Sequence, residues 1–218
     1  MIRALAILVL TALPAAATVD GWPALHDVAN VGADDVLNIR RAPDAGSEII
    51  GTLDHGATEI EVVRPNGDLT WGLVNTGEQS GWVSLTYMRR SVPYWDGQFP
   101  ELRQCFGTEP FWTLEVDGPE TTLIMLGAEP RDGLISSMYS SRSRRDRFAL
   151  GGAFLPTENG PSALHLSVHM EPCNDGMSDR EYGITVDMLL TSSDASAAQD
   201  AVGLYSGCCS IQPPSASH

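Results

Sequence analysis

The sequence predicts an all-β protein in which a small barrel is followed by a disulfide-linked antiparallel β-barrel or sandwich. Its 218 residues include 14 prolines and 21 glycines, and long helical patterns are rare. Short runs of alternating apolar and polar residues recur between turn signals, which is typical of strands. All four cysteines lie between residues 105 and 209, so covalent cross-links are expected there.

The amino-terminal segment has the three-part layout of a secretory signal peptide. Arg3 precedes an apolar stretch, Pro14 interrupts it, and the alanines at residues 15–17 provide a small-residue cleavage pattern. A membrane span needs roughly 20 apolar residues, and this stretch is about half that long. We expect residues 1–17 to be removed and the mature protein to be periplasmic or secreted, with no membrane insertion after cleavage.

The chain is strongly acidic, with a formal net charge of −15. Removal of the signal segment takes away only Arg3 among the charged side chains, so the mature protein is one unit more negative. The phosphates of nucleic acids and of anionic membranes repel such a surface. The charge therefore argues against nucleic acid as a partner.

Residues 25–90 carry the pattern of a small β-barrel. Gly, Pro, Asn and Asp mark the turns between short strand-like runs. In one run Ile60 and Val62 alternate with Glu59 and Glu61, so the two pairs are expected on opposite faces. The strand-like runs are residues 36–40, 49–53, 58–63, 70–74 and 81–84.

This first module resembles the bacterial SH3 domain. The resemblance rests on Leu-Asn-Ile-Arg-Arg-Ala-Pro at residues 37–43, Ile-Gly-Thr-Leu at 50–53, Trp-Gly-Leu-Val at 71–74 and Gly-Trp-Val-Ser at 81–84. It implies a barrel that binds cell-wall peptides or glycans, or that positions a neighbouring domain. We therefore expect the module to recognise a cell-envelope component such as peptidoglycan, and an envelope protein is the alternative partner.

Five side chains of the first module are candidate ligand contacts. Aromatic faces stack on sugars or peptides, and Asn and Arg supply hydrogen bonds. The alternative is that the tryptophans pack in the barrel core and that the asparagine serves a turn. The candidates are Asn38, Arg40, Trp71, Trp82 and Tyr87.

A connector and a second module follow. Residues 91–100 contain three aromatic side chains among prolines, so we expect this connector to pack on the modules rather than move freely. Residues 101–210 form the second module, and residues 211–218 are expected to be a flexible tail. The strand-like runs of the second module are residues 111–116, 121–126, 148–150, 163–170 and 183–190, with a hairpin turn at 117–120.

The second module resembles an uncharacterised family of exported or membrane-associated bacterial proteins. The resemblance rests on Cys-x-Gly-Thr-Glu-Pro-Phe-Trp at residues 105–112, Cys-x-Asp-Gly-Met-Ser at 173–178 and Gly-Cys-Cys at 207–209. It implies no established activity.

The four cysteines predict two disulfides in an oxidising compartment. A bridge between the neighbours Cys208 and Cys209 would be strained, so Cys105 and Cys173 are each expected to pair with one of them. Which pairs with which stays open. A zinc site is the competing interpretation, but there is no C-x-x-C pair and the histidines are poorly spaced, so neither a metal nor another cofactor is expected.

Catalytic chemistry has few candidates. Glu109 beside Trp112 could act as a general acid in an apolar setting. Glycosidase chemistry would need a second carboxylate, for which Asp175 or Asp179 is the candidate. His165 and His169 lie on a strand-like run, where four residues span roughly 13 Å and cannot share an ion. We therefore expect a non-enzymatic exported binding protein. The alternatives are an envelope enzyme or enzyme inhibitor whose site lies in the second module, and a structural envelope protein.

Overall fold

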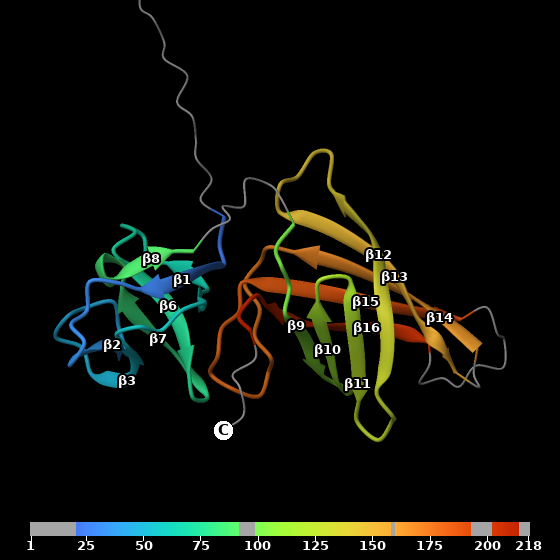
Figure 1. The fold of residues 1–218 in the computed structure, drawn as a ribbon, viewed down its shortest axis with the longest axis horizontal. Helices are drawn as coiled ribbons and strands as arrows, with labels where there is room; N and C mark the ends of the chain where they lie inside the picture. The colour runs from blue at the N-terminus through green and yellow to red at the C-terminus, as the bar shows by residue number, and fades with distance from the viewer. Residues whose placement is uncertain (1–20, 92–98, 158–159, 193–201, 214–218) are drawn as a thin grey trace, which may run out of the picture.

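The computed structural model describes residues 21–91, 99–157, 160–192 and 202–213 (Figure 1). In these ranges every regular element is a strand except one 3₁₀ turn, so the predicted all-β fold is confirmed. The predicted signal peptide at residues 1–17 lies outside the described residues, as do residues 92–98 of the connector and 214–218 of the tail. None of the described residues forms a helix long and apolar enough to cross a membrane.

The first module consists of two sheets that share one core. The sheets have the strand orders β4-β1-β8 and β3-β2-β7-β6-β5. Val62 and Val83 are fully buried in the shared core, and Ile39 is 1% exposed. The five predicted runs all correspond to strands, and β1, β5 and β8 are additional. The elements are β1 (Ala24–Val28), β2 (Val36–Arg40), β3 (Ile49–Asp54), β4 (Ile60–Val62), β5 (Arg64–Pro65), β6 (Trp71–Thr76), β7 (Gln79–Ser84), η1 (Leu85–Tyr87) and β8 (Met88–Arg90).

The second module is a closed antiparallel barrel of eight strands. Each strand pairs with its neighbour along the chain, and β9 also pairs with β16 to close the ring, which resolves the choice between barrel and sandwich. Figure 1 shows the barrel beside the first module. Its strands are β9 (Gln104–Thr108), β10 (Phe111–Asp117), β11 (Glu120–Met125), β12 (Arg131–Ser140), β13 (Arg147–Thr157), β14 (Gly160–His169), β15 (Ile184–Ser192) and β16 (Gly203–Ser210).

Alternation along the strands fills the barrel. On β14 the side chains of Leu164, Leu166 and Val168 point inward and are at most 2% exposed. The strand period of two therefore places His165 and His169 on the outer side, as the sequence predicts. Burying branched apolar side chains at about 25 cal/mol per Å² is the main stabilising contribution to such a core.

One disulfide joins the two strands that close the barrel, and the other ties a long loop to the barrel. Cys105 lies directly opposite Cys209 in the β9–β16 pairing, and these two are bonded. Cys173 is bonded to Cys208. The prediction that Cys105 and Cys173 each reach one member of the neighbouring pair is confirmed. The choice between the two pairings follows from register, because only Cys209 faces Cys105 across the sheet.

The two modules meet through polar contacts. Arg64 on β5 donates three hydrogen bonds of 3.0 to 3.2 Å to the carboxylate of Glu181 in the loop before β15. Gln79 at the start of β7 forms an isolated bridge with Asp179 of the same loop. Glu61 points away from Val62, as predicted, yet it is only 5% exposed because the segment after β16 covers it.

Candidate functional site

A hollow of about 450 Å³ lies on the first module and brings together four of the five predicted ligand residues. The loop between β1 and β2, strand β2 and the start of β6 form its walls, and η1 contributes an aromatic ring. The four are Asn38, Arg40, Trp71 and Tyr87. Because segments distant in sequence form the hollow, its shape depends on the folded module rather than on one loop.

Strand β2 supplies the hydrogen-bonding groups of the hollow. Asn38 and Arg40 are two residues apart on this strand, so both side chains project from the same face. The Arg40 guanidinium donates a 2.6 Å hydrogen bond to the carbonyl oxygen of Ser47, which fixes the side chain against the β2–β3 loop. Within the part of the chain that the structure describes, the Asn38 amide makes no side-chain hydrogen bond, so its groups are available to a ligand.

Two aromatic side chains border the same space. Trp71 is held by its backbone, whose N–H donates a 3.0 Å hydrogen bond to the side-chain oxygen of Asn66. Tyr87 lies on η1, and its carbonyl oxygen accepts a 2.9 Å hydrogen bond from Ala29. The Tyr87 side chain is 42% exposed, so part of its ring is open to contact. A fixed backbone with a partly open ring is suited to stacking.

Trp82 does not line this hollow. Its ring lies under Arg64, whose guanidinium carbon is 5.1 Å from the ring centre. Arg64 in turn binds Glu181 of the second module, so Trp82 belongs to the junction between the modules. The sequence gives no signal for this, because the partner of Arg64 lies 117 residues away.

The arrangement can bind a small polar ligand through ring faces and hydrogen bonds. Asp35 also lines the hollow, opposite in charge to Arg40, and the sequence analysis does not single it out. In the sequence, only the position of Asp35 in an acidic turn just before β2 indicates such a role. A space of about 450 Å³ is within the range of small-molecule sites and has room for part of a peptide or for a sugar unit.

The three candidates of the second module are not brought together as a catalytic group. Trp112 is 3% exposed and packs in the barrel core. A Cβ on Gly107 would lie 2.3 Å from Trp112 Nε1, so glycine is required where β9 passes the indole. Glu109 is exposed in the turn between β9 and β10 and does not line the shallow hollow that Trp112 and Asp175 share.

Asp175 organises the turn after Cys173. Its carboxylate accepts hydrogen bonds from the N–H groups of Met177 and Ser178, at 3.0 and 2.9 Å, and from the Ser178 hydroxyl. Partial burial alone would raise the pKa of Asp175, but the hydrogen bonds from Ser178 and Met177 outweigh it and lower that pKa. A carboxyl group that is held ionised and accepts hydrogen bonds at both oxygens is suited to fixing a turn.

A buried carboxyl group, that of Glu61, lies at the junction and has no functional signal in the sequence. Burial raises the pKa of Glu61 to about 7, although Ser210, Gln212 and Ile211 donate hydrogen bonds to it. These donors all reach Oε2, while Oε1 is buried and has no hydrogen-bond partner. The sequence shows only an alternating glutamate on a strand, since the covering segment is about 150 residues away.

Among the described residues, no group of three or more His, Cys, Asp or Glu side chains is placed to hold a metal ion. His169 pairs with the Ser167 hydroxyl at 2.9 Å on the outside of the barrel. The arginine-rich loop after β12 is exposed, and Arg144 there forms an ion pair with Asp146.

No protein-family model, curated protein or solved structure matches the chain.

Proposed function

We propose that the protein is an exported binding protein whose first module, residues 25–90, is an SH3-like domain that recognises a peptide or glycan of the cell envelope. The observation that carries the proposal is the hollow of about 450 Å³ that gathers Asn38, Arg40, Trp71 and Tyr87. Their residue types and positions in the sequence predict ligand contact, and they come from three separate elements.

The chemistry of the hollow suits cell-wall material. A sugar ring presents an apolar face to an aromatic side chain and hydroxyl or acetamido groups to amides and guanidinium groups. A wall peptide adds carboxylates and an amine, which would pair with Arg40 and Asp35 respectively. Both ligand types therefore have complementary groups, and peptidoglycan contains both.

Export is the second part of the proposal. The two disulfides fit a protein that matures in an oxidising compartment. The described residues contain no free cysteine. Together with the signal-like residues 1–17, this supports a periplasmic or secreted location.

Retention on purified peptidoglycan tests the ligand. The chain from residue 18 onward is the appropriate sample, because isolating residues 25–90 would expose Glu61 and Trp82. We expect the protein to sediment with peptidoglycan sacculi and to be released by soluble muramyl peptides or by N-acetylglucosamine oligomers. Release by only one of the two identifies the part of the polymer that is bound.

Two exposed tyrosines provide a matched pair of variants. Tyr87→Ala removes a ring from the hollow, whereas Tyr139→Ala removes a ring on the barrel that is 66% exposed. A stacked ring contributes about 1 kcal/mol, so Tyr87→Ala should weaken retention about fivefold and Tyr139→Ala should not. If the unmodified protein is retained no better than an unrelated acidic protein, envelope recognition by this hollow is wrong.

A further inference from the structure

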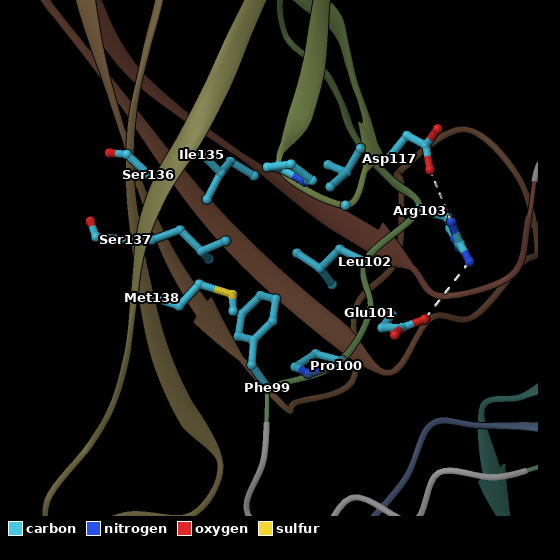
Figure 2. A pocket seen from close by; sticks show the side chains of 14 residues that line it. Phe99, Pro100, Glu101, Leu102, Arg103, Asp117, Ile135, Ser136, Ser137 and Met138 are labelled. Carbon is cyan, nitrogen blue, oxygen red and sulfur yellow. Dashed lines mark hydrogen bonds and ion pairs between the residues drawn. The ribbon is translucent and has the colours of Figure 1, made fainter.

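The closed barrel has an opening on one side, where β12 extends past its neighbour β11. Strand β12 runs to Ser140, but its neighbour β11 begins at Glu120, opposite Leu134. Residues 136–140 therefore pair with β13 only, within the part of the chain that the structure describes. We call the space between residues 99–103, residues 117–119 and residues 135–138 the side opening (Figure 2).

A β-bulge marks the point where β12 leaves β11. The β12–β13 register shifts between Ile135 and Ser137, so Ser136 is the extra residue. The glycine at position 152 of β13 permits the bulge, because a Cβ there would lie 2.3 Å from the carbonyl oxygen of Leu134. A bulge bends its strand and increases the local twist. The bulge therefore accounts for the separation of β12 from the turn that connects β10 and β11.

The backbone along the opening has unused hydrogen-bonding groups. The N–H of Ser141 donates to the carbonyl oxygen of Arg147 on the β13 side, at 3.0 Å. Backbone groups alternate sides along an antiparallel strand, so the N–H and C=O of Met138 and Ser140 point away from β13. Among the described residues nothing pairs with them. An unpaired strand edge is a template for another strand.

The space beside this edge is apolar and of useful size. It measures about 670 Å³, and Leu102, Val116, Ile135 and Leu150 contribute buried apolar side chains to its lining. Met138 pairs across the sheet with inward-facing Leu150, yet it is 59% exposed. Figure 2 shows Met138 and Ile135 on β12 facing Phe99 and Leu102 across the opening. An inward-facing methionine that remains exposed marks a gap in the core.

Charge differs between the two ends of the opening. Next to Ser140 lies the arginine-rich loop, in which Arg142 is exposed. At the other end the Asp117 and Glu101 side chains are 90% and 77% exposed, and each forms an ion pair with Arg103, at 3.5 and 3.7 Å. A ligand along β12 would therefore meet positive charge at one end and predominantly negative charge at the other.

We propose that the side opening binds an extended peptide segment of another protein, which adds as a strand to residues 136–140 of β12. The peptide places an apolar side chain against Leu102 and Ile135 and carries acidic residues at the end next to Arg142. Strand addition obtains its affinity from main-chain hydrogen bonds and its specificity from alternate side chains, and the opening offers both. This surface is separate from the hollow of the first module.

Designed peptides test the proposal on the chain from residue 18 onward. The probe is a fluorescein-labelled peptide, Glu-Glu-Thr-Val-Thr-Leu-Thr-Val-Thr-Lys, which in antiparallel pairing places its glutamates beside Arg142. A second probe has the order of residues reversed, for parallel pairing. We expect one of them to bind saturably in fluorescence anisotropy, and we expect replacement of its glutamates by lysines to weaken binding at least tenfold.

Two N-methylated versions of the bound peptide report on strand pairing. Methyl groups on one alternate set of amides block the edge that faces β12, and those on the other set do not. We expect only one of the two versions to lose binding. Equal binding by both versions would overturn strand addition.

Two exposed methionines give matched protein variants. Met138→Asp places a charge in the side opening, whereas Met177→Asp places one in a turn where Met177 is 65% exposed. We expect Met138→Asp to weaken peptide binding at least tenfold and Met177→Asp to leave it unchanged. Because both positions are largely exposed, both variants should fold, which circular dichroism checks.

Hydrogen exchange gives the decisive readout. Peptide binding should slow amide exchange at Met138 and Ser140 at least tenfold, because both amides face the unpaired edge. Exchange at Tyr139, which already faces β13, should be unchanged. If no peptide binds, the proposal is wrong. If decanoic acid binds in a manner sensitive to Met138→Asp while the peptides do not bind, the opening is a small-molecule site and the proposal is also wrong.

Discussion

The carboxylate of Glu61 on β4 accepts a 3.1 Å hydrogen bond from the backbone N–H of Ile211, the residue that follows β16. This contact joins the first module to the end of the barrel. It also removes the carboxyl group from water, because Glu61 is 5% exposed and its Oε1 has no partner. The junction therefore contains a group whose protonation is coupled to folding.

Stability should fall as pH rises across the titration of Glu61. Burial raises the pKa of Glu61 from 4.5 to about 7, so the folded state holds this proton more tightly than the unfolded state. The free energy of unfolding from this group is highest below about pH 4.5 and declines until about pH 7. The difference corresponds to about 3 kcal/mol. Glu61→Gln should remove this decline, measured by urea unfolding at several pH values.

Glu61→Gln needs a control variant because a second buried group, His26, also has a shifted pKa. Burial lowers the pKa of His26, so His26 makes the protein less stable as pH falls below 6.5. Its effect opposes that of Glu61 in part of the same range. Glu48→Gln, at an exposed carboxylate paired with Arg41, serves as the control. If Glu61→Gln and Glu48→Gln give the same pH profile, the buried carboxyl group does not affect stability.

The two disulfides should differ in their contribution to stability. Cys105–Cys209 closes a loop of 104 residues and Cys173–Cys208 one of 35. In the chain-entropy account these loops correspond to about 5 and about 4 kcal/mol. We expect Cys105→Ala with Cys209→Ala to lower the free energy of unfolding more than Cys173→Ala with Cys208→Ala. Urea unfolding of the two double variants measures this, and the reverse order would contradict the account.

Trp112 should behave as a core residue. Replacing a buried tryptophan by alanine typically costs about 3 to 5 kcal/mol, and Trp112 is 3% exposed. Phe111→Ala, at the adjacent residue that is 46% exposed, should cost less than about 1.5 kcal/mol. Thermal unfolding of the two variants compares them. Similar melting temperatures would show that Trp112 is free to act in a surface site.

Export should leave a chemical record on the mature protein. Mass spectrometry of protein from the periplasm or medium should show the loss of residues 1–17 and of four hydrogen atoms, one for each bonded sulfur. Non-reduced peptides should contain Cys105 joined to Cys209. A full-length chain with four free thiols would contradict both the disulfides and the proposed location.

The fold was largely predictable because strand alternation is a local property. The run around Leu164, Leu166 and Val168 alternates regularly, and β14 is found there. Strand β12 was missed, because its glycine and serines leave little apolar alternation, and its bulge interrupts the period. Strand β16 was also missed, since it owes its place to pairing with β9 and to the disulfides.

The hollow was predictable in part for a similar reason. Asn38 and Arg40 share a strand, so the sequence places them on one face. Whether a tryptophan faces a ligand or a partner module depends on contacts far along the chain. Trp71 and Trp82 have similar sequence surroundings, yet Arg64 and Glu181 place Trp82 in the junction. The burial of Glu61 likewise depends on a segment about 150 residues away in the sequence.

Nuclear magnetic resonance of the ¹⁵N-labelled chain, titrated with soluble muramyl peptides and with N-acetylglucosamine oligomers, tests the central claim most directly. We expect the indole signal of Trp71, the side-chain amide signal of Asn38 and the backbone signal of Tyr87 to shift with one of these ligands. The indole signals of Trp82 and Trp112 should remain in place. Shifts confined to Trp112 and its surroundings, or no shifts with either ligand, would contradict recognition of the cell envelope by the first module.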